Sequence, residues 1–312
     1  MISMRYHIVS LAAIFLALAL GIVLGATKIN SPLLAGLQSD KTDLSTQRDE
    51  LAQQNENLQN QVSADARFAG AIAPLAVRGT LPGAQVVLIT TDTADPADRD
   101  AVLSLLSRAG ATVTAQIQVT SDFSDPARAE QLRQLSVQNL PTGSTLPEVS
   151  QAGAIAGGLL ADLLLTDKDG KPLATPDQAT AALSALSSAG FITASGPVAP
   201  GRSVVVITGP ARSGDSASSR AQTIVDMAAA LKGTAQGVVL AGRTGSEGTT
   251  GSVGLVRSDT AASAVVSTVD DVNTDSGRLA TVLALVEQNG GGVGRYGVGA
   301  NAQAPAPTLA VG

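Results

Sequence analysis

The sequence contains no cysteine and a single histidine, and aromatic residues make up only 2% of its 312 positions. The missing cysteines exclude disulfide frameworks, thiolate zinc sites and cysteine nucleophiles, and one histidine excludes catalytic pairs of imidazoles. So few aromatic residues cannot supply the aromatic girdles of a transmembrane β-barrel. A net charge of −6 disfavours binding to nucleic acid. These absences favour a non-enzymatic protein of the cell envelope, for which we expect no cofactor and no nucleic-acid partner.

A long uncharged run is present near the amino terminus, after a short leading tail (1–7). Residues 8–26 read IVSLAAIFLALALGIVLGA, and as a helix they would measure roughly 28 Å, close to the ~30 Å of bilayer hydrocarbon. The alternative is a cleaved signal peptide, because Arg5 gives a positive leading region, but no clear cleavage site follows and the run exceeds the usual length of about 7 to 15 residues. We therefore predict an uncleaved transmembrane helix. Lys28 and Lys41 follow the run, so the positive charges only weakly favour a large extracytoplasmic domain.

Small residues recur along this predicted span at every fourth position, at Ala17, Gly21 and Gly25. Such a stripe lets two membrane helices approach closely. The alternative is that Gly and Ala are simply common in membrane helices. The segment that follows favours the first interpretation.

Residues 33–68 show a leucine at every seventh position, which predicts a coiled coil. These leucines, assigned to heptad position d, are Leu37, Leu44, Leu51 and Leu58. The residues at position a are Leu34, Lys41, Arg48, Asn55 and Val62. A mostly polar a column, Asn55 above all, favours a parallel two-stranded coil at some cost in stability. The alternative is one amphipathic helix packed on its own domain. We predict a parallel homodimer or higher homo-oligomer, because the span and the heptads are tethered and support each other.

From residue 82 the pattern changes to alternating short apolar runs and helical spacings. This order predicts an α/β fold with a mostly parallel sheet over 82–299, divided into two lobes near 166–200 as an alternative, and a disordered tail at 300–312. The predicted strands are residues 85–91, 112–119, 191–194, 203–208, 237–241, 253–257 and 293–298. The predicted helices are residues 96–109, most of 125–165, 177–189, 218–231 and 276–288.

Oxygen-bearing side chains cluster before the last predicted helix. Asp271, Asn273 and Asp275, with Asp270 beside them, resemble the opening of a calcium loop, but counted from Asp271 the sixth position is Ser276 instead of Gly and the twelfth is Val282 instead of Glu. An EF-hand is therefore rejected, and Asp275 or Ser276 is expected to cap the helix. The four residues remain candidates for a cation or partner site.

Two glycine-rich stretches resemble ligand-binding motifs without fitting them. Residues 292–297 satisfy G-x-G-x-x-G but are not followed by a helix, so we expect an edge strand or turn there. Residues 242–251 lack the lysine of a phosphate-binding loop, so we expect a hairpin connection.

Several segments together resemble one known family. These are the opening MISMRYHIVSLAAIFLALALGIVLG, the heptads behind it, the stretch STVDDVNTDSGRLATVLAL and the closing RYGVG. They are similar to the mycobacterial copper transport protein family, MctB, over essentially the whole chain. The resemblance implies a cell-envelope protein that keeps intracellular copper low and is described as an outer-membrane or pore-forming component. It implies copper as a partner and supplies no metal-ligating residues.

The side chains fit that implication poorly, because copper is bound mainly by thiolate, thioether and imidazole groups. Met1, Met4 and His7 form a group of such side chains at the membrane entry, which we interpret as incidental, and Met227 is expected in the core. A single span cannot enclose a pore, so conduction would require an oligomer. We therefore carry two hypotheses: a copper channel or efflux component in contact with membrane lipid, and a dimeric envelope scaffold or binding module.

Overall fold

The computed structural model describes residues 4–144 and 150–308, apart from the side chains of residues 27–35. The chain divides into two compact units, Met1–Ala64 and Asp65–Gly312. Met1, the side chains of Lys28 and Leu34, and residues 309–312 of the predicted tail lie outside the described residues. We call the second unit the head.

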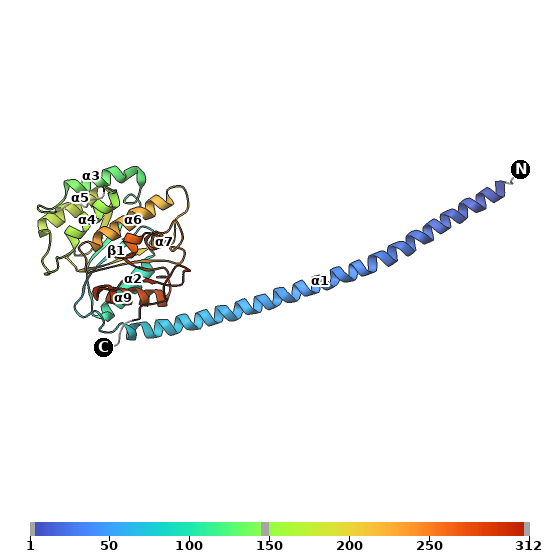
Figure 1. The fold of residues 1–312 in the computed structure, drawn as a ribbon, viewed down its shortest axis with the longest axis horizontal. Helices are drawn as coiled ribbons and strands as arrows, with labels where there is room; N and C mark the ends of the chain where they lie inside the picture. The colour runs from blue at the N-terminus through green and yellow to red at the C-terminus, as the bar shows by residue number, and fades with distance from the viewer. Residues whose placement is uncertain (1–3, 145–149, 309–312) are drawn as a thin grey trace. The chain divides into compact units, whose positions relative to one another are not determined.

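One continuous helix, α1 (Met4–Ala76), contains both the predicted span and the predicted heptad segment (Figure 1). Among the described residues, one stretch of it, Met4–Ala26, is long and apolar enough to cross a membrane. The last turns of α1 belong to the head, where Ala73 and Val77 are buried. The helix is confirmed, and its pairing into a coiled coil stays a prediction.

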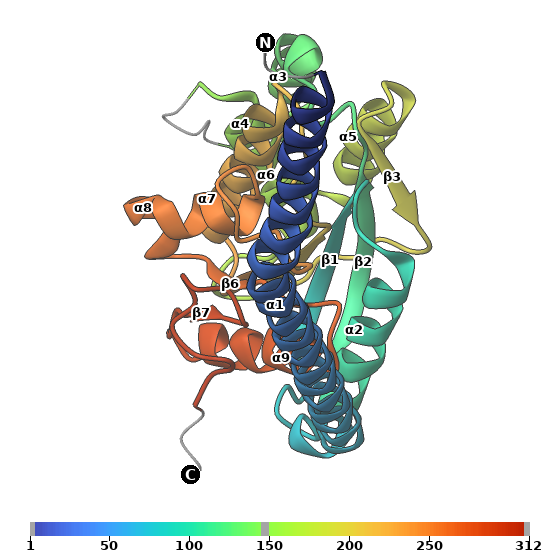
Figure 2. The ribbon, with the colours of Figure 1, turned by 90° about the vertical axis from the view of Figure 1, so that its right-hand side faces the viewer.

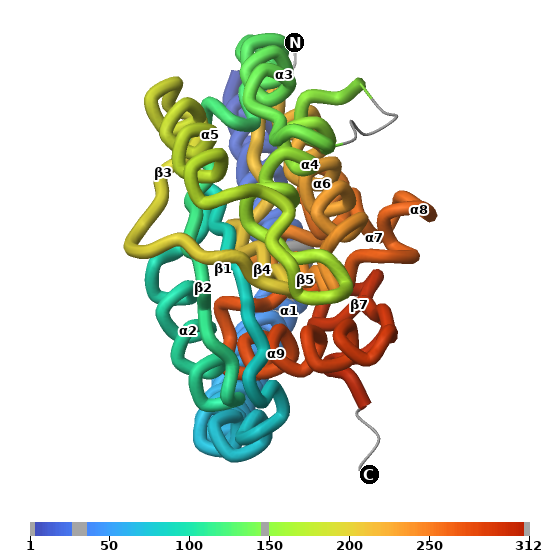
Figure 3. Tube along the Cα trace, turned by 90° about the vertical axis from the view of Figure 1, so that its left-hand side faces the viewer, coloured from blue at the N-terminus to red at the C-terminus, as the bar shows by residue number. Residues whose placement is uncertain are grey.

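The head is built on one seven-stranded sheet in the order β3-β2-β1-β4-β5-β6-β7. All neighbouring strands are parallel except β2 and β3. Figure 3 shows β2, β1, β4 and β5 side by side, and Figure 2 shows β3 beside β2. The strands are β1 (Gln85–Thr91), β2 (Thr112–Val119), β3 (Ile192–Ser195), β4 (Ser203–Thr208), β5 (Gly237–Gly242), β6 (Ser267–Val269) and β7 (Arg295–Tyr296).

Helices cover both faces of this sheet (Figure 1). On one face lie α2 (Pro96–Ala109) and α9 (Asp275–Asn289). The other face carries α3 (Ala129–Gln138), α4 (Ala152–Leu164), α5 (Pro176–Ser188), α6 (Ala217–Lys232) and α7 (Ser252–Ser258). Two short helices, η1 (Pro126–Arg128) and α8 (Thr260–Ser263), complete the described elements.

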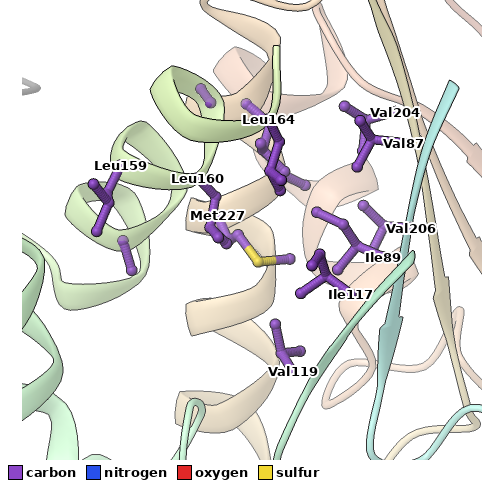
Figure 4. Packing of buried hydrophobic residues seen from close by; sticks show 14 of the residues in the cluster. Val87, Ile89, Ile117, Val119, Leu159, Leu160, Leu164, Val204, Val206 and Met227 are labelled. Atoms are coloured by element: carbon purple, nitrogen blue, oxygen red, sulfur yellow. The ribbon is translucent and has the colours of Figure 1, made fainter. Parts of the chain in front are cut away.

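Burial on both faces explains why the central strands are apolar without interruption. Successive strand residues point to opposite faces, so Val87 and Ile89 join the core under α4 and α6, while Val86 and Leu88 join the core under α2 and α9. Met227 lies in the first of these cores, among Leu160, Ile89 and Ile117 (Figure 4). The prediction that Met227 is a core residue is confirmed.

The strand predicted at 253–257 is wrong, because this segment is the helix α7, Ser252–Ser258. A short apolar run fits either a strand or one buried helical face, and here Val253 and Val256, three residues apart, are both buried. The hairpin predicted for 242–251 is wrong for the same reason, since the loop leads into α7. On the side away from β4, β5 pairs in parallel with β6, a strand that the sequence analysis missed.

The prediction of a helix at 276–288 is confirmed by α9, but its cap is neither Asp275 nor Ser276. The Thr274 side chain caps it by accepting a hydrogen bond from the Gly277 N–H. The sequence G-x-G-x-x-G at 292–297 holds β7, which lies at the edge of the sheet as expected.

Candidate functional site

The residues predicted to mediate dimerisation lie on one exposed helix. In the described chain, Leu37, Leu44, Leu51 and Leu58 are each between 60% and 66% exposed. Asn55 accepts a 2.7 Å hydrogen bond from Gln59 on the same helix.

The small residues in the span are equally uncovered. Ala17 and Gly21 are exposed, Gly25 is partly exposed, and a Cβ added at either glycine would meet no described atom within 4 Å. Both stripes are thus apolar or small surfaces for which the described chain supplies no partner, and their use in dimerisation remains a prediction.

Asp270 is fully buried and forms an ion pair with the buried Arg257, with 2.6 Å between Nη1 and Oδ2. Its other oxygen accepts a 2.8 Å hydrogen bond from the Val298 N–H. Arg257 also donates to Thr268 Oγ1 and to the Tyr296 carbonyl. Asp270 therefore joins β6 to α7 and to the segment after β7.

Asp271 is also buried, but no arginine among the described residues pairs with it. Its Oδ2 accepts a 3.0 Å hydrogen bond from Thr274 Oγ1, whereas Oδ1 is buried without a partner among the described residues. Burial raises the pKa of Asp271 and the neighbouring Asp270 charge adds to this, against the Thr274 hydrogen bond and the Arg257 charge.

Asn273 and Asp275 hold neighbouring segments in place. Asn273 Oδ1 accepts hydrogen bonds from the N–H and the hydroxyl of Thr244, at 2.9 and 3.1 Å. Asp275 pairs with Arg278 at 3.0 Å and lies against Gly70, where an added Cβ would be 2.5 Å from its Oδ2. Within the described chain no three His, Asp or Glu side chains are grouped to hold a metal ion. The cation role of these residues stays a prediction.

The crevice most typical of ligand binding in this architecture lies between the carboxyl ends of β1 and β4, where the chain leaves neighbouring strands in opposite directions. Here the cavity volume is about 20 Å³, room for about one water molecule. Gly209 lies close against Thr93, where an added Cβ would be 2.3 Å from the Thr93 carbonyl oxygen, and its N–H donates to Thr93 Oγ1 at 3.1 Å. Arg212 lines the cavity and pairs with Asp92 across it.

A second group of charges, missed by the sequence analysis, surrounds Asp98 in the first turn of α2. Asp98 is almost fully buried and lies 2.8 Å from Arg278 Nη2 and 3.2 Å from Arg243 Nε. Arg243 also pairs with Asp95, and Arg278 with Asp275. The group ties α2, the end of β5 and α9 together. Its arginines lie more than a hundred residues from Asp98, so no local pattern indicates the pairing.

The copper-compatible side chains that the structure describes differ in burial. Met4 and His7 lie exposed at the start of α1, in the first unit, whereas Met227 is buried in the core of the head.

Comparison with known proteins gives a full-length match. The family described as "Copper transport outer membrane protein, MctB" matches residues 1–307. A protein of Mycobacterium tuberculosis (strain H37Rv) named "Copper transporter MctB" is 40% identical over 307 residues, covering 96% of this chain and 97% of its own. A protein of the same name from Mycobacterium leprae is 36% identical over 310 residues, with the same coverage.

Proposed function

The chain belongs to the MctB family of copper transport proteins, and from this membership we propose that it is a membrane-anchored protein of the cell envelope that helps to keep intracellular copper low. The names of the relatives support the link to copper. The outer membrane, named in the family description, is the proposed location.

The observation that carries the anchoring part of the proposal is the uninterrupted helix α1. Its first segment, Met4–Ala26, has the length and composition of a membrane span, and the helix then runs on without a break into the head. An anchored chain of this form contacts membrane lipid through residues 8–26. The short leading tail with Arg5 supports a head on the extracytoplasmic side.

Transport by this protein alone requires several copies, because one span encloses no pore. The small-residue stripe and the leucine heptads on α1 supply two surfaces for self-association, as a parallel homodimer or a larger homo-oligomer. Direct conduction of copper would then take place between the spans of the oligomer.

A second candidate is a dimeric scaffold or binding module without transport activity. It is favoured by the small size, about 20 Å³, of the cavity between the ends of β1 and β4, where a protein of this architecture would hold a small ligand. Of the two, the copper role is preferred because the match to copper transporters extends over nearly the entire chain.

The proposal is tested in a strain that lacks this gene, complemented with the intact chain or with a chain deleted for residues 8–26. After growth in added copper, total cell copper is measured by mass spectrometry. The intact chain should lower cell copper and the deleted chain should not. Equal copper in the uncomplemented strain and in both complemented strains would contradict the proposal.

Reconstitution separates transport from an indirect role. Purified full-length protein in liposomes is assayed for copper flux, with protein-free liposomes as the control. Flux supports a channel. Lower cell copper without flux supports an indirect part in export, and no effect in either assay favours the scaffold.

A further inference from the structure

The last turns of α1 have two distinct apolar faces. The first packs on the head: Ala73, together with Val77 just after the helix, is buried in the core shared with α2 and α9, and Gly70 lies against Asp275. This contact fixes which side of these last turns faces the rest of the head.

The second face of the same turns is uncovered. Phe68 is 69% exposed, Ile72 38% and Leu75 57%. Their spacing of four and then three residues places them along one side of a helix. Since the head occupies the other side, this strip has no partner within the described chain.

The strip continues the heptad seam of the stalk. Counting in sevens from Leu58 places Asp65 and then Ile72 at position d, and Ala69 and Ala76 at position a. Phe68 and Leu75 fall at position g, which flanks the seam in a two-stranded coil. Asp65 interrupts the series, and the apolar pattern resumes after it.

Lipid is a poor occupant for this strip. Phe68 follows the end of the span at Ala26 by 42 residues of the same helix, about twice the ~20 residues that a helix needs to cross the hydrocarbon. A second copy of the chain suits it better, because a parallel coil places Ile72 opposite its own counterpart and continues the contacts of the leucines before it.

We propose that the dimer seam extends through Phe68, Ile72 and Leu75, so that a second copy covers this strip and the two heads are held side by side. The inference rests on the proposed homodimer and adds to it the place where the dimer contact ends. In such a dimer the heads are paired at a fixed rotation, since each is already fixed to its own helix by Ala73 and Val77.

Because the chain has no cysteine, single cysteines can map the seam in the full-length protein. Leu51→Cys probes the stalk and Ile72→Cys probes the head end, both at position d. The matched controls are Gln53→Cys and Ala71→Cys, which lie on the outside of the predicted coil in the same turns. Each variant is purified in detergent and oxidised mildly with diamide, and the disulfide-linked dimer is measured on non-reducing gels.

The proposal predicts several-fold more cross-linked dimer for Ile72→Cys than for Ala71→Cys, at a level similar to that of Leu51→Cys. Cross-linking at residue 51 without cross-linking at residue 72 would overturn this inference and leave the proposed homodimer intact. No cross-linking at either position would overturn both.

Discussion

Among the ion pairs of the described residues, Arg257–Asp270 is the most completely buried, with side-chain exposures of 2% and 0%. A pair of this kind costs much free energy when one partner is removed, because the remaining charge stays buried without compensation. The Arg257–Asp270 pair joins α7, β6, β7 and the chain after β7, and it holds these four segments in position.

Replacing Asp270 with Asn should therefore destabilise the head by about 3–5 kcal/mol. Urea unfolding at neutral pH measures this loss. Asp100→Asn is the matched control, since the pair Arg99–Asp100 is largely exposed and should contribute far less. Equal losses in the two variants would show that Asp270 is not held as described.

Asp271 gives a pH-dependent prediction. Because burial raises its pKa above the ordinary value of 3.8, the folded head binds this proton more tightly than the unfolded chain does. The raised pKa therefore stabilises the wild-type head at pH values below 3.8. This stabilisation is lost as the pH rises through the pKa of the folded state.

Asp271→Asn lacks that titration, so its stability relative to wild type should increase as the pH rises from about 3.5 to 7. Urea unfolding at a series of pH values measures the difference. Asn also retains an oxygen that accepts the Thr274 hydrogen bond, which limits other effects of the change. A difference that stays constant with pH would contradict the raised pKa.

At the level of elements, most of the head could be predicted because the central strands β1, β4 and β5 are nearly continuous apolar runs and both faces of the sheet are covered. The residues at 253–257 misled the prediction, since Val253 and Val256 are buried by a helical turn against β5 and β6. Local sequence does not tell whether such a short apolar run will form a buried strand or the buried side of a helix.

The candidate site was less predictable than the fold. The acidic residues at 270–275 were found because they are close in sequence. Their partners were missed, since Arg257, Thr244 and Gly70 reach them only through the folded chain. The same applies to Asp98 and its two arginines.

The close crossing of α4 and α6 gives a prediction for a packed element. A Cβ at Gly157 would lie 2.7 Å from the carbonyl oxygen and 2.8 Å from the Cα of Met227. Gly157→Ala should push the helices apart and cost about 1–3 kcal/mol, measured by urea unfolding of the head. Gly36→Ala is the control, because its added Cβ meets nothing within 4 Å. An unchanged unfolding midpoint for Gly157→Ala would contradict this packing.

The exposed heptads of α1 give a prediction for the stalk. Leu44→Lys combined with Leu51→Lys places like charges on the predicted seam and should convert the dimer to monomer. Sedimentation of the detergent-solubilised full chain measures the change. Gln53→Lys, on the outside of the coil, should leave the dimer intact. A dimer that persists in the double variant would exclude this seam as the interface.

The whole molecule has three parts in chain order: a proposed membrane span, a helical stalk and an α/β head. The span and stalk belong to one helix, and the head buries the end of that helix in its core. Self-association and the proposed role in copper homeostasis both depend on the span remaining in the mature protein. If it were removed, the stalk would lose the tether that raises the effective concentration of its partner.

The most direct test is therefore the fate of residues 1–26 in cells. The full chain is expressed with a carboxyl-terminal tag, membranes are washed at alkaline pH, and the tagged protein is analysed by intact mass. We predict that the protein stays in the washed membranes with its leading residues attached. A soluble protein whose first residue lies beyond Ala26 would contradict it.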